Sequence, residues 1–285
     1  MTKQMKRGNK NVLFYFILFL TFFGIVAYIL YINFARSYNI TVHFIDVGQG
    51  DATLISSPYG NMLIDGGDNH MGPTMVQYLS NLGIYFINYV IATHPHADHI
   101  GGLIPVLDNF SVGTLIMPNR AHTTLTFERF LEAIEKNDIN VIEPIVNNSI
   151  TIGNISFNIV APNSYGYSNL NDYSIVILME YRDVSFLFTG DAERVSEQEI
   201  LSENHNISAN VLQVGHHGSN TSTTQEFLQR VNPQIAVISV GEGNMYGHPH
   251  NAVINRLNYH GIYIFRTDIH GNILISTNGR SIRVN

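Results

Sequence analysis

Apolar positions along the first half of the chain alternate between short β-type runs and helical repeats. ITVHFIDVGQGDATLISS predicts two strands joined by a glycine-rich turn, and NMLIDGG predicts another short strand. GPTMVQYLSNLG has proline near its start and glycine at its end, which is the usual punctuation of a helix. INYVIATH then reads as a strand, LIPVLDNF as a helix, VGTLIM as a strand and TTLTFERFLEAIEKN as an amphipathic helix.

The second half repeats this organisation. The predicted strands are SITIGNISFNIVAP, SIVILMEY, VSFLFTG, ANVLQVG, PQIAVISVG, YIFRT, GNILIST and SIRVN. The predicted helices are AERVSEQEILSEN, TTQEFLQRV and HNAVINRLNYHG. Hairpins come first and strand–helix alternations follow in each half. This order predicts two sheets packed together with helices outside, in one domain over residues 38–285.

The N-terminal segment has a different pattern. Residues 1–11 contain Lys3, Lys6, Arg7 and Lys10 and no acidic residue, and residues 12–32 are an uncharged apolar run. A helix of about 20 apolar residues spans a bilayer, whereas a signal peptide usually has a shorter apolar core. We therefore expect a cytoplasmic basic segment and an uncleaved transmembrane anchor over 12–32. The positive-inside rule then predicts a single-pass protein of the cell membrane with its C-terminal domain extracytoplasmic.

The composition limits which metal ligands and which binding partners the chain can have. The chain has no cysteine, which excludes disulfides, thiolate zinc sites and a cysteine nucleophile, so metal ligands would have to be His, Asp or Glu. Residues 37–285 hold 10 Arg and Lys against 22 Asp and Glu, a difference of −12. Domains that grip nucleic acid tightly usually have a basic face. The balance weighs against tight nucleic-acid binding without excluding it, because scattered arginines could form a local patch.

The segment THPHADHIGG is rich in ligand-type side chains. His94 and His96 are two residues apart, so in an extended loop both project to the same side and can share one metal ion. Pro95 between them restricts the backbone to that extended form. Asp98 and His99 follow at a predicted helix start, point in another direction and could hold a second ion. Imidazole and carboxylate ligands suit Zn²⁺ or Mn²⁺.

Further ligands are expected at the ends of other strands. FLFTGDAE places Asp191 behind a glycine turn, where one carboxylate could bridge two ions. VLQVGHHGSN places His216 and His217 at a strand end, before Gly218 and a predicted helix start. Taken alone, TGD is usually a turn and helix cap, and HHGS is a weak signal. Combined with the His-x-His-x-Asp-His segment, they predict a dinuclear metal site.

At these residues the sequence resembles the metallo-β-lactamase superfamily, whose HxHxDH motif matches HPHADH, and within it the hydrolase domain of the ComEC competence proteins. The resemblance covers roughly residues 40–276 and rests on FIDVGQGDATLI, LIDGG, THPHADHIGG, NDYSIVI, FLFTGDAE, VGHHGSNTST and GHPH, in that order. It implies an α/β (α+β) fold, a four-layer αββα sandwich with a dinuclear site on one edge. The chain is also similar to pneumococcal phosphorylcholine esterase, which carries such a domain outside the cell.

The resemblance also implies roles for these residues. His94 and His96 would bind the first metal, Asp98 and His99 the second, and Asp191 would bridge both. The cofactors would be two divalent ions, with Zn²⁺ expected and Mn²⁺ as the alternative. Gly101 and Gly102, just after the cluster, would allow close packing under the site.

The HHGS pair is assigned in the same way. His217 would complete the second site and His216 would contact the substrate or the leaving group, although the reverse assignment is open. Many family members supply a third histidine to the first metal, and this chain has SNLNDYSIV in that region. Asn171 is the stand-in expected there. An amide is a poorer ligand than imidazole, so the first site would be weaker or would prefer Mn²⁺.

Other polar residues have candidate roles near the site. His248, in MYGHPHNAV, is a candidate phosphate contact or proton donor, and a structural role in a helix-entry turn is the alternative. Asp65 could orient a ligand histidine. Asp46 and Asp51 would organise the backbone of the DVGQGD turn. For all three aspartates a structural role is preferred.

These observations predict a membrane-anchored, dinuclear metal-dependent hydrolase. It would cleave phosphodiesters with a hydroxide that bridges the metals, is held by Asp191 and is oriented by Asp98, while His216 or His248 stabilises developing charge. The expected partners are a phosphodiester substrate such as single-stranded DNA, and the membrane through the N-terminal helix; the sequence indicates no protein partner. The alternatives are a non-catalytic or weakly catalytic DNA-uptake module, and a cell-wall or phosphorylcholine esterase, which the acidic composition favours.

Overall fold

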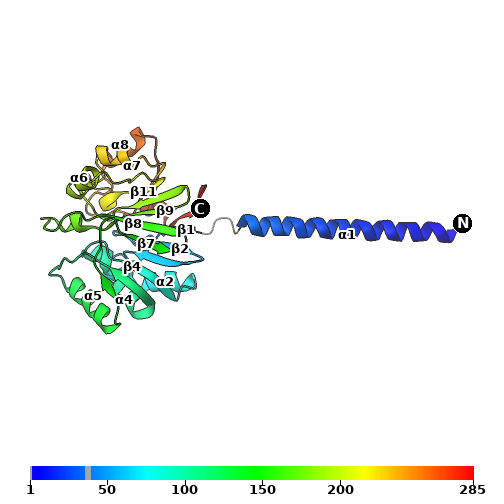
Figure 1. The fold of residues 1–285 in the computed structure, drawn as a ribbon, viewed down its shortest axis with the longest axis horizontal. Coiled ribbons are helices and arrows are strands. Elements are labelled where there is room, and N and C mark those ends of the chain that lie inside the picture. Colours follow the sequence, from blue (N-terminus) through cyan, green and yellow to red (C-terminus); the bar gives the residue numbers. More distant parts are fainter. Residues whose placement is uncertain (1, 36–39) are drawn as a thin grey trace. The chain divides into compact units, whose positions relative to one another are not determined.

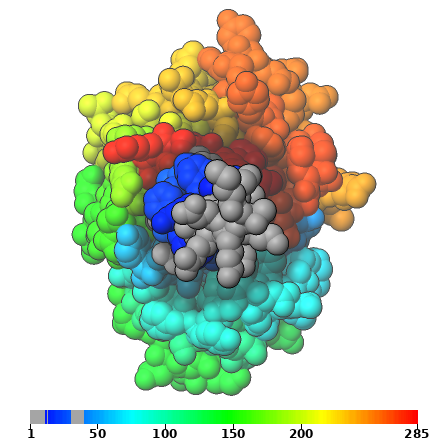
Figure 2. Space-filling view, turned by 90° about the vertical axis from the view of Figure 1, so that its right-hand side faces the viewer, coloured from blue at the N-terminus to red at the C-terminus, as the bar shows by residue number. Residues whose placement is uncertain are grey.

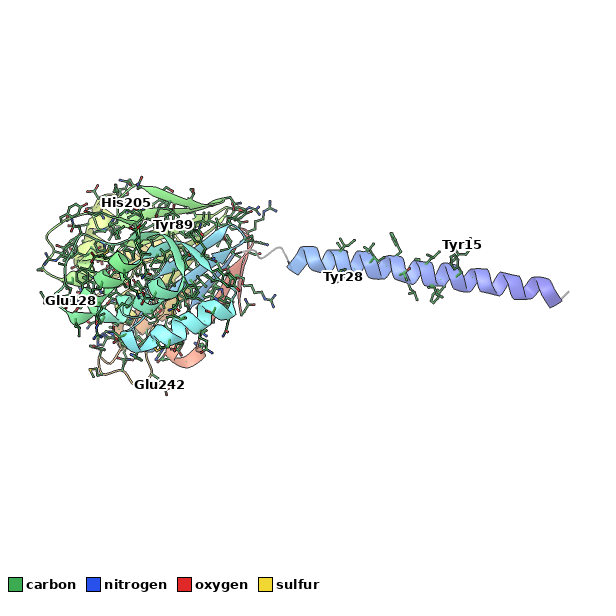
Figure 3. The ribbon with its side chains drawn as sticks, turned by 90° about the horizontal axis from the view of Figure 1, so that it is seen from below. Tyr15, Tyr28, Tyr89, Glu128, His205 and Glu242 are labelled. Carbon is green, nitrogen blue, oxygen red and sulfur yellow. The ribbon has the colours of Figure 1, made fainter. Side chains whose placement is uncertain are left out.

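A computed structural model describes residues 2–35 and 40–285, and divides into two units. The first unit contains helix α1 (Thr2–Ala35), from which Tyr15 and Tyr28 project into solvent (Figure 3). Within the described residues, no helix combines the length and the apolar character that crossing a membrane requires. The predicted transmembrane anchor over residues 12–32 is therefore not supported. The predicted domain start at residue 38 lies outside the described residues.

The second unit, Ile40–Asn285, contains two sheets. From edge to edge, the first consists of β15 (Ile282–Val284), β14 (Ile273–Thr277), β1 (Ile40–Phe44), β2 (Thr53–Ser57), β3 (Gly60–Ile64), β4 (Phe86–Ile91), β5 (Ser111–Ile116) and β6 (Val141–Ile142). Strands β14, β1, β2 and β3 pair antiparallel, as hairpins do, whereas β3 to β6 pair in parallel.

The second sheet has the same division into antiparallel and parallel strands. It consists of β13 (Tyr263–Arg266), β12 (Ile235–Ile238), β11 (Val211–Gln213), β10 (Val184–Phe188), β9 (Val176–Tyr181), β8 (Ile155–Ala161) and β7 (Ser149–Ile152). Strands β7 to β10 pair antiparallel, and β10 to β13 pair in parallel. Because parallel strands end on the same edge of a sheet, the loops that follow them gather there.

Helices lie on both sides of the paired sheets. Along the chain they are α2 (Gly72–Asn81), α3 (Ala97–Ile100), α4 (Leu103–Asn109), α5 (Leu125–Lys136), α6 (Arg194–Ser202), α7 (Gln225–Val231), α8 (Asn251–Tyr259) and α9 (Thr267–His270), with 3₁₀ turns η1 (Asn69–Met71), η2 (Leu170–Tyr173) and η3 (Gly215–Gly218). Figure 1 shows α2, α4 and α5 on one side of the strands and α6, α7 and α8 on the other. In Figure 2 the cyan segment that includes α2 and the orange segment that includes α8 lie on opposite sides of one face.

Three apolar clusters hold these layers together. One lies between the sheets and includes Phe44 and Phe186, both fully buried. The other two lie between each sheet and its helices, with Phe130 of α5 in one and Phe227 of α7 in the other. Successive side chains of β1 point to opposite faces of the sheet. Phe44 faces the other sheet, while His43 beside it contacts Tyr78 of α2. The predicted arrangement of two sheets with helices outside is confirmed.

Candidate metal centre

Asp191 lies at the centre of a histidine cluster. It follows β10 behind Gly190 and is buried, with 2% of its surface exposed. Its Oδ1 lies 3.3 Å from His99 Nε2 and 3.5 Å from His217 Nε2. Its Oδ2 lies 3.7 Å from His94 Nε2 and 3.6 Å from His216 Nε2. The two oxygens of one carboxylate therefore face two different pairs of histidines.

The group around Asp191 Oδ1 includes a second carboxylate. Asp98 Oδ2 lies 3.4 Å from His217 Nε2 and 3.9 Å from His99 Nε2. Within the part of the chain that the structure describes, His99 Nε2, His217 Nε2 and Asp191 Oδ1 are buried and have no hydrogen-bond partner. Buried polar atoms without partners are costly and rare, so three facing one another indicate a missing ligand. Two imidazole nitrogens and two carboxylate oxygens are a donor set that fits a divalent cation.

The group around Asp191 Oδ2 is richer in nitrogen. His96 Nδ1 lies 2.9 Å from His94 Nε2, so the two side chains converge as their spacing predicts. The backbone at His96 is extended, with φ −75° and ψ 149°. His94 Nε2 and His216 Nε2 each face Asp191 Oδ2, and His94, His99 and Asp191 offer donor atoms that lie within 4.8 Å of one another. This donor set also fits a divalent cation.

A buried aspartate fixes the ring of His99. Asp65 Oδ2 accepts a hydrogen bond from His99 Nδ1 at 2.8 Å, and Asp65 also accepts from Thr93 N at 2.8 Å and Thr93 Oγ1 at 2.7 Å. This contact turns Nε2 of His99 toward Asp191, where it can bind a cation once it has lost its proton. Asp65 thus occupies the place of a residue that orients a ligand histidine.

The same arrangement orients the HHGS pair. His217 Nδ1 donates to Ser239 O at 3.0 Å, and His216 Nδ1 lies 2.9 Å from Glu193 Oε1. Both Nε2 atoms then face Asp191. Asn171 Nδ2 donates to Glu193 Oε1 at 3.0 Å, so the amide group of Asn171 is turned toward this carboxylate. Glu193 is the last residue of the FLFTGDAE segment, but the sequence analysis assigned it no role.

The backbone of the HHGS pair has an unusual conformation. The pair lies in η3, and α7 begins at Gln225, inside the predicted helix TTQEFLQRV. His216 and His217 have left-handed φ values of 50° and 54°. This conformation is unfavourable for residues other than glycine and is typical of functional sites, where the surrounding structure imposes it. It directs two adjacent side chains to different oxygens of Asp191.

Burial and charge act in opposite directions on these groups. Burial raises the pKa of Asp191, but His217 and His99 beside it lower the pKa well below its ordinary value, so the group is an anion. Burial lowers the pKa of His94 far below its ordinary value, which keeps this imidazole neutral. Burial also disfavours a charged His99, but Asp191, Asp65 and Asp98 raise its pKa well above the ordinary value. A cation that binds there must displace the His99 proton.

The DVGQGD turn packs against the group around Asp191 Oδ1. Asp51 Oδ1 lies 3.5 Å from His217 Nδ1, and Asp51 N donates to Asp98 O at 3.2 Å. A Cβ atom at Gly50 would lie 2.3 Å from Asp98 O, so only glycine allows this approach. Asp46 Oδ1 accepts from Gly48 N at 3.1 Å and shapes the turn itself.

A hollow of about 330 Å³ opens over both groups. His248 lines it, and the His248 ring lies 5.4 Å from that of His216. Gln49, His122 and Tyr246 also line it; Gln49 lies in DVGQGD and Tyr246 in MYGHPHNAV, but the sequence analysis assigned a role to none of the three. His122 comes from the loop between β5 and α5, and its ring lies 5.5 Å from that of His96.

The fold and this cluster agree with the sequence comparisons. The model of the metallo-beta-lactamase superfamily matches residues 45–242, and the chain belongs to this superfamily. Its domain is of the ComEC type: it is 33% identical over 266 residues to ComE operon protein 3 of Bacillus subtilis (strain 168), covering 87% of this chain and 34% of that protein. It is 32% identical over 240 residues to Recombination protein 2 of Haemophilus influenzae, covering 82% and 28%.

The chain therefore spans about a third of the length of these curated relatives. Among solved structures, the metallo-β-lactamase fold protein YhfI of Bacillus subtilis aligns with a TM-score of 0.54 at 10% identity, covering 87% of this chain and 100% of that one. At this identity the likeness concerns the fold alone.

Proposed function

We propose that this protein is a dinuclear metal-dependent hydrolase that cleaves phosphodiesters. The proposal rests on the position of Asp191 in a solvent-accessible hollow. One of its carboxylate oxygens faces His99 and His217, and the other faces His94 and His216. Members of the superfamily with such a centre are generally metal-dependent hydrolases. The relatives named for competence and recombination favour a nucleic-acid phosphodiester.

The proposed first ion is held by His94 Nε2, His96 Nδ1 and His216 Nε2 together with Asp191 Oδ2. This assignment makes His216 a ligand, in place of the substrate contact expected from the sequence. Asn171 Nδ2 then supports Glu193, which orients His216, while Asn171 Oδ1 is buried beside the centre without a hydrogen-bond partner among the described residues. Three imidazoles and one carboxylate favour Zn²⁺ at this position.

The proposed second ion is held by Asp98, His99 and His217 together with Asp191 Oδ1. When bound, two such ions polarise a phosphoryl group and lower the pKa of water toward neutrality. Burial opposes the charge of Asp98, but His99 and His217 lower its pKa below the ordinary value, so this carboxylate is an anion at the hollow. It can accept a hydrogen bond from an attacking water and orient it toward phosphorus.

His248 is proposed to contact the phosphoryl group. Burial, with His216 and His217 nearby, lowers the pKa of His248 to about 4, so the ring is neutral in the folded protein. A neutral imidazole can donate one N–H hydrogen bond to a phosphoryl oxygen on which charge develops.

Metal analysis and turnover of bis-p-nitrophenyl phosphate test this function. The comparison uses the full chain, Asp191→Asn, His94→Ala and, as a control, His260→Ala, which removes an exposed histidine outside the hollow. We expect two ions and turnover in the native chain and in His260→Ala, and loss of both in the two site variants. Full turnover in Asp191→Asn would contradict the proposal, and bound metal without any turnover would favour a non-catalytic module.

A further inference from the structure

Tyr246 is an exposed aromatic residue at the rim of the hollow. It lies in the loop between β12 and α8, on which Glu242 is labelled in Figure 3, and 60% of its surface is exposed. Its ring lies against that of His248, with centroids 5.7 Å apart and planes at 24°. An open, flat ring is thereby presented next to a residue that lines the metal centre.

Asn244 fixes the loop that presents this ring. Its Nδ2 donates to Gly241 O at 2.9 Å and to His248 O at 2.6 Å. Its Oδ1 accepts from Tyr246 N at 3.2 Å and His248 N at 3.0 Å. A ring held in place before binding loses little conformational freedom when a planar ligand stacks on it.

Tyr246 also separates two hollows. The hollow over the metal centre shares Gln49, Ala97, Asp98 and Tyr246 with a second one of about 490 Å³, in which Met245 is 91% exposed. Among the described residues, no lysine or arginine lines either hollow, and Tyr246 is the only tyrosine or phenylalanine that does. A ligand that extends beyond the metal centre into the second hollow therefore passes an aromatic ring and meets no lysine or arginine of the described chain.

We propose that Tyr246 is a stacking platform for a nucleobase next to the scissile phosphate, so that the substrate is single-stranded nucleic acid. This inference rests on the proposed phosphodiesterase function. A base can stack on a side chain only when it is free of its duplex, and such stacking tolerates any base. Because neither hollow is lined by lysine or arginine from the described part of the chain, phosphates away from the metal centre find no such side chain to pair with. Contacts to the bases would then hold this part of the substrate. A quaternary ammonium group would call for several aromatic rings around one cation, and one ring is present.

The test compares Tyr246→Ala with Tyr246→Phe in the metal-loaded full chain. The substrates are an oligodeoxythymidylate, an abasic oligomer of equal length and methyl p-nitrophenyl phosphate. We expect Tyr246→Ala to raise KM for the oligodeoxythymidylate by about 10-fold more than for the other two, because only this substrate carries bases. Tyr246→Phe keeps the ring and should behave like the native chain, as should Tyr259→Ala, which removes an exposed tyrosine outside both hollows.

Other outcomes overturn the inference. Equal KM changes for the thymidylate and the abasic oligomer would exclude base stacking. A selective rise for p-nitrophenylphosphorylcholine would assign Tyr246 to a cation. If the native chain turns over none of these substrates, the phosphodiesterase function fails. Fluorescence anisotropy of labelled oligodeoxythymidylate then still tests the stacking role of Tyr246. Binding that is lost in Tyr246→Ala and kept in Tyr246→Phe supports this role, and equal binding in both variants contradicts it.

Discussion

At the scale of single residues, the centre depends on side chains that do not themselves face a metal position. Glu193 contacts His216 Nδ1, and Asp65 contacts His99 Nδ1, so each carboxylate turns one imidazole toward Asp191. Since the two histidines belong to different ligand groups, the two carboxylates should influence different ions.

Replacing Glu193 with alanine tests this separation. We expect the affinity of the first ion to fall by about 10–100-fold, because His216 loses the acceptor that fixes its ring, while the second ion is retained. Metal titration against a competing chelator measures both affinities. Glu180→Ala is the matched control, since that carboxylate contacts Asn158 on the sheet and no site residue. Unchanged affinity of both ions in Glu193→Ala would contradict this role.

His43 predicts a pH dependence of stability away from the centre. It is 5% exposed, and burial lowers its pKa from 6.5 to about 4. The unfolded chain binds a proton at this histidine near pH 6.5 and the folded chain only near pH 4, so its contribution is complete above pH 6.5 and is lost as the pH falls toward 4.

Urea unfolding at pH 7 and pH 5 measures this contribution. The part due to His43 amounts to about 2 kcal/mol of unfolding free energy between these pH values. In His43→Asn, whose amide can still reach the Tyr78 hydroxyl, the difference between the two pH values should shrink by that amount. An identical difference in the variant and the native chain would show that His43 is not the group that titrates.

At the scale of elements, the THPHADHIGG segment packs closely against the turn after β3 that carries Asp65. Gly66 N donates to His99 O at 2.8 Å, and Gly102 N donates to Gly67 O at 2.8 Å. A Cβ atom at Gly102 would lie 1.9 Å from Gly66 O, so the turn after β3 that carries Asp65 could not approach α3 with any larger residue there. The sequence expectation of close packing at this glycine is confirmed.

Substituting Gly102 with alanine should therefore affect both stability and metal binding. Overpacking of this kind costs about 1–3 kcal/mol of unfolding free energy, and separating the two turns should weaken the second ion. Gly83→Asn is the control, because nothing lies within 4 Å of a Cβ atom there and asparagine tolerates the left-handed φ of 71°. Denaturant unfolding and metal titration report the two effects; equal behaviour of the two variants would refute the packing argument.

Elements with a regular apolar period were predictable from the sequence, and the HHGS turn was not. Alternate residues of β1 (Ile40, Val42 and Phe44) pack between the sheets, and the buried residues of α5 follow a helical repeat. The left-handed backbone of His216 and His217 opposes local preference and is imposed by packing around it. No periodic pattern contains that information, so the sequence did not predict this backbone conformation and left the roles of His216 and His217 interchangeable.

At the scale of the whole molecule, the centre consists of residues from distant parts of the chain. The loops after β4, β10 and β11 belong to two sheets, and their residues meet because both sheets end their parallel strands at one edge. The motifs identified the histidines and aspartates that converge there. Glu193 and Tyr246 lie inside the FLFTGDAE and MYGHPHNAV segments and His122 lies in neither, but the proximity of these three residues to the centre exists only in the folded chain.

The proposed mechanism requires two cations, one on either side of Asp191. Anomalous diffraction from crystals of the full chain grown with Zn²⁺ tests it most directly. We expect two peaks, one among His94, His96, His216 and Asp191 Oδ2, and the other among Asp98, His99, His217 and Asp191 Oδ1. A single peak, or peaks that do not contact Asp191, would contradict the dinuclear centre.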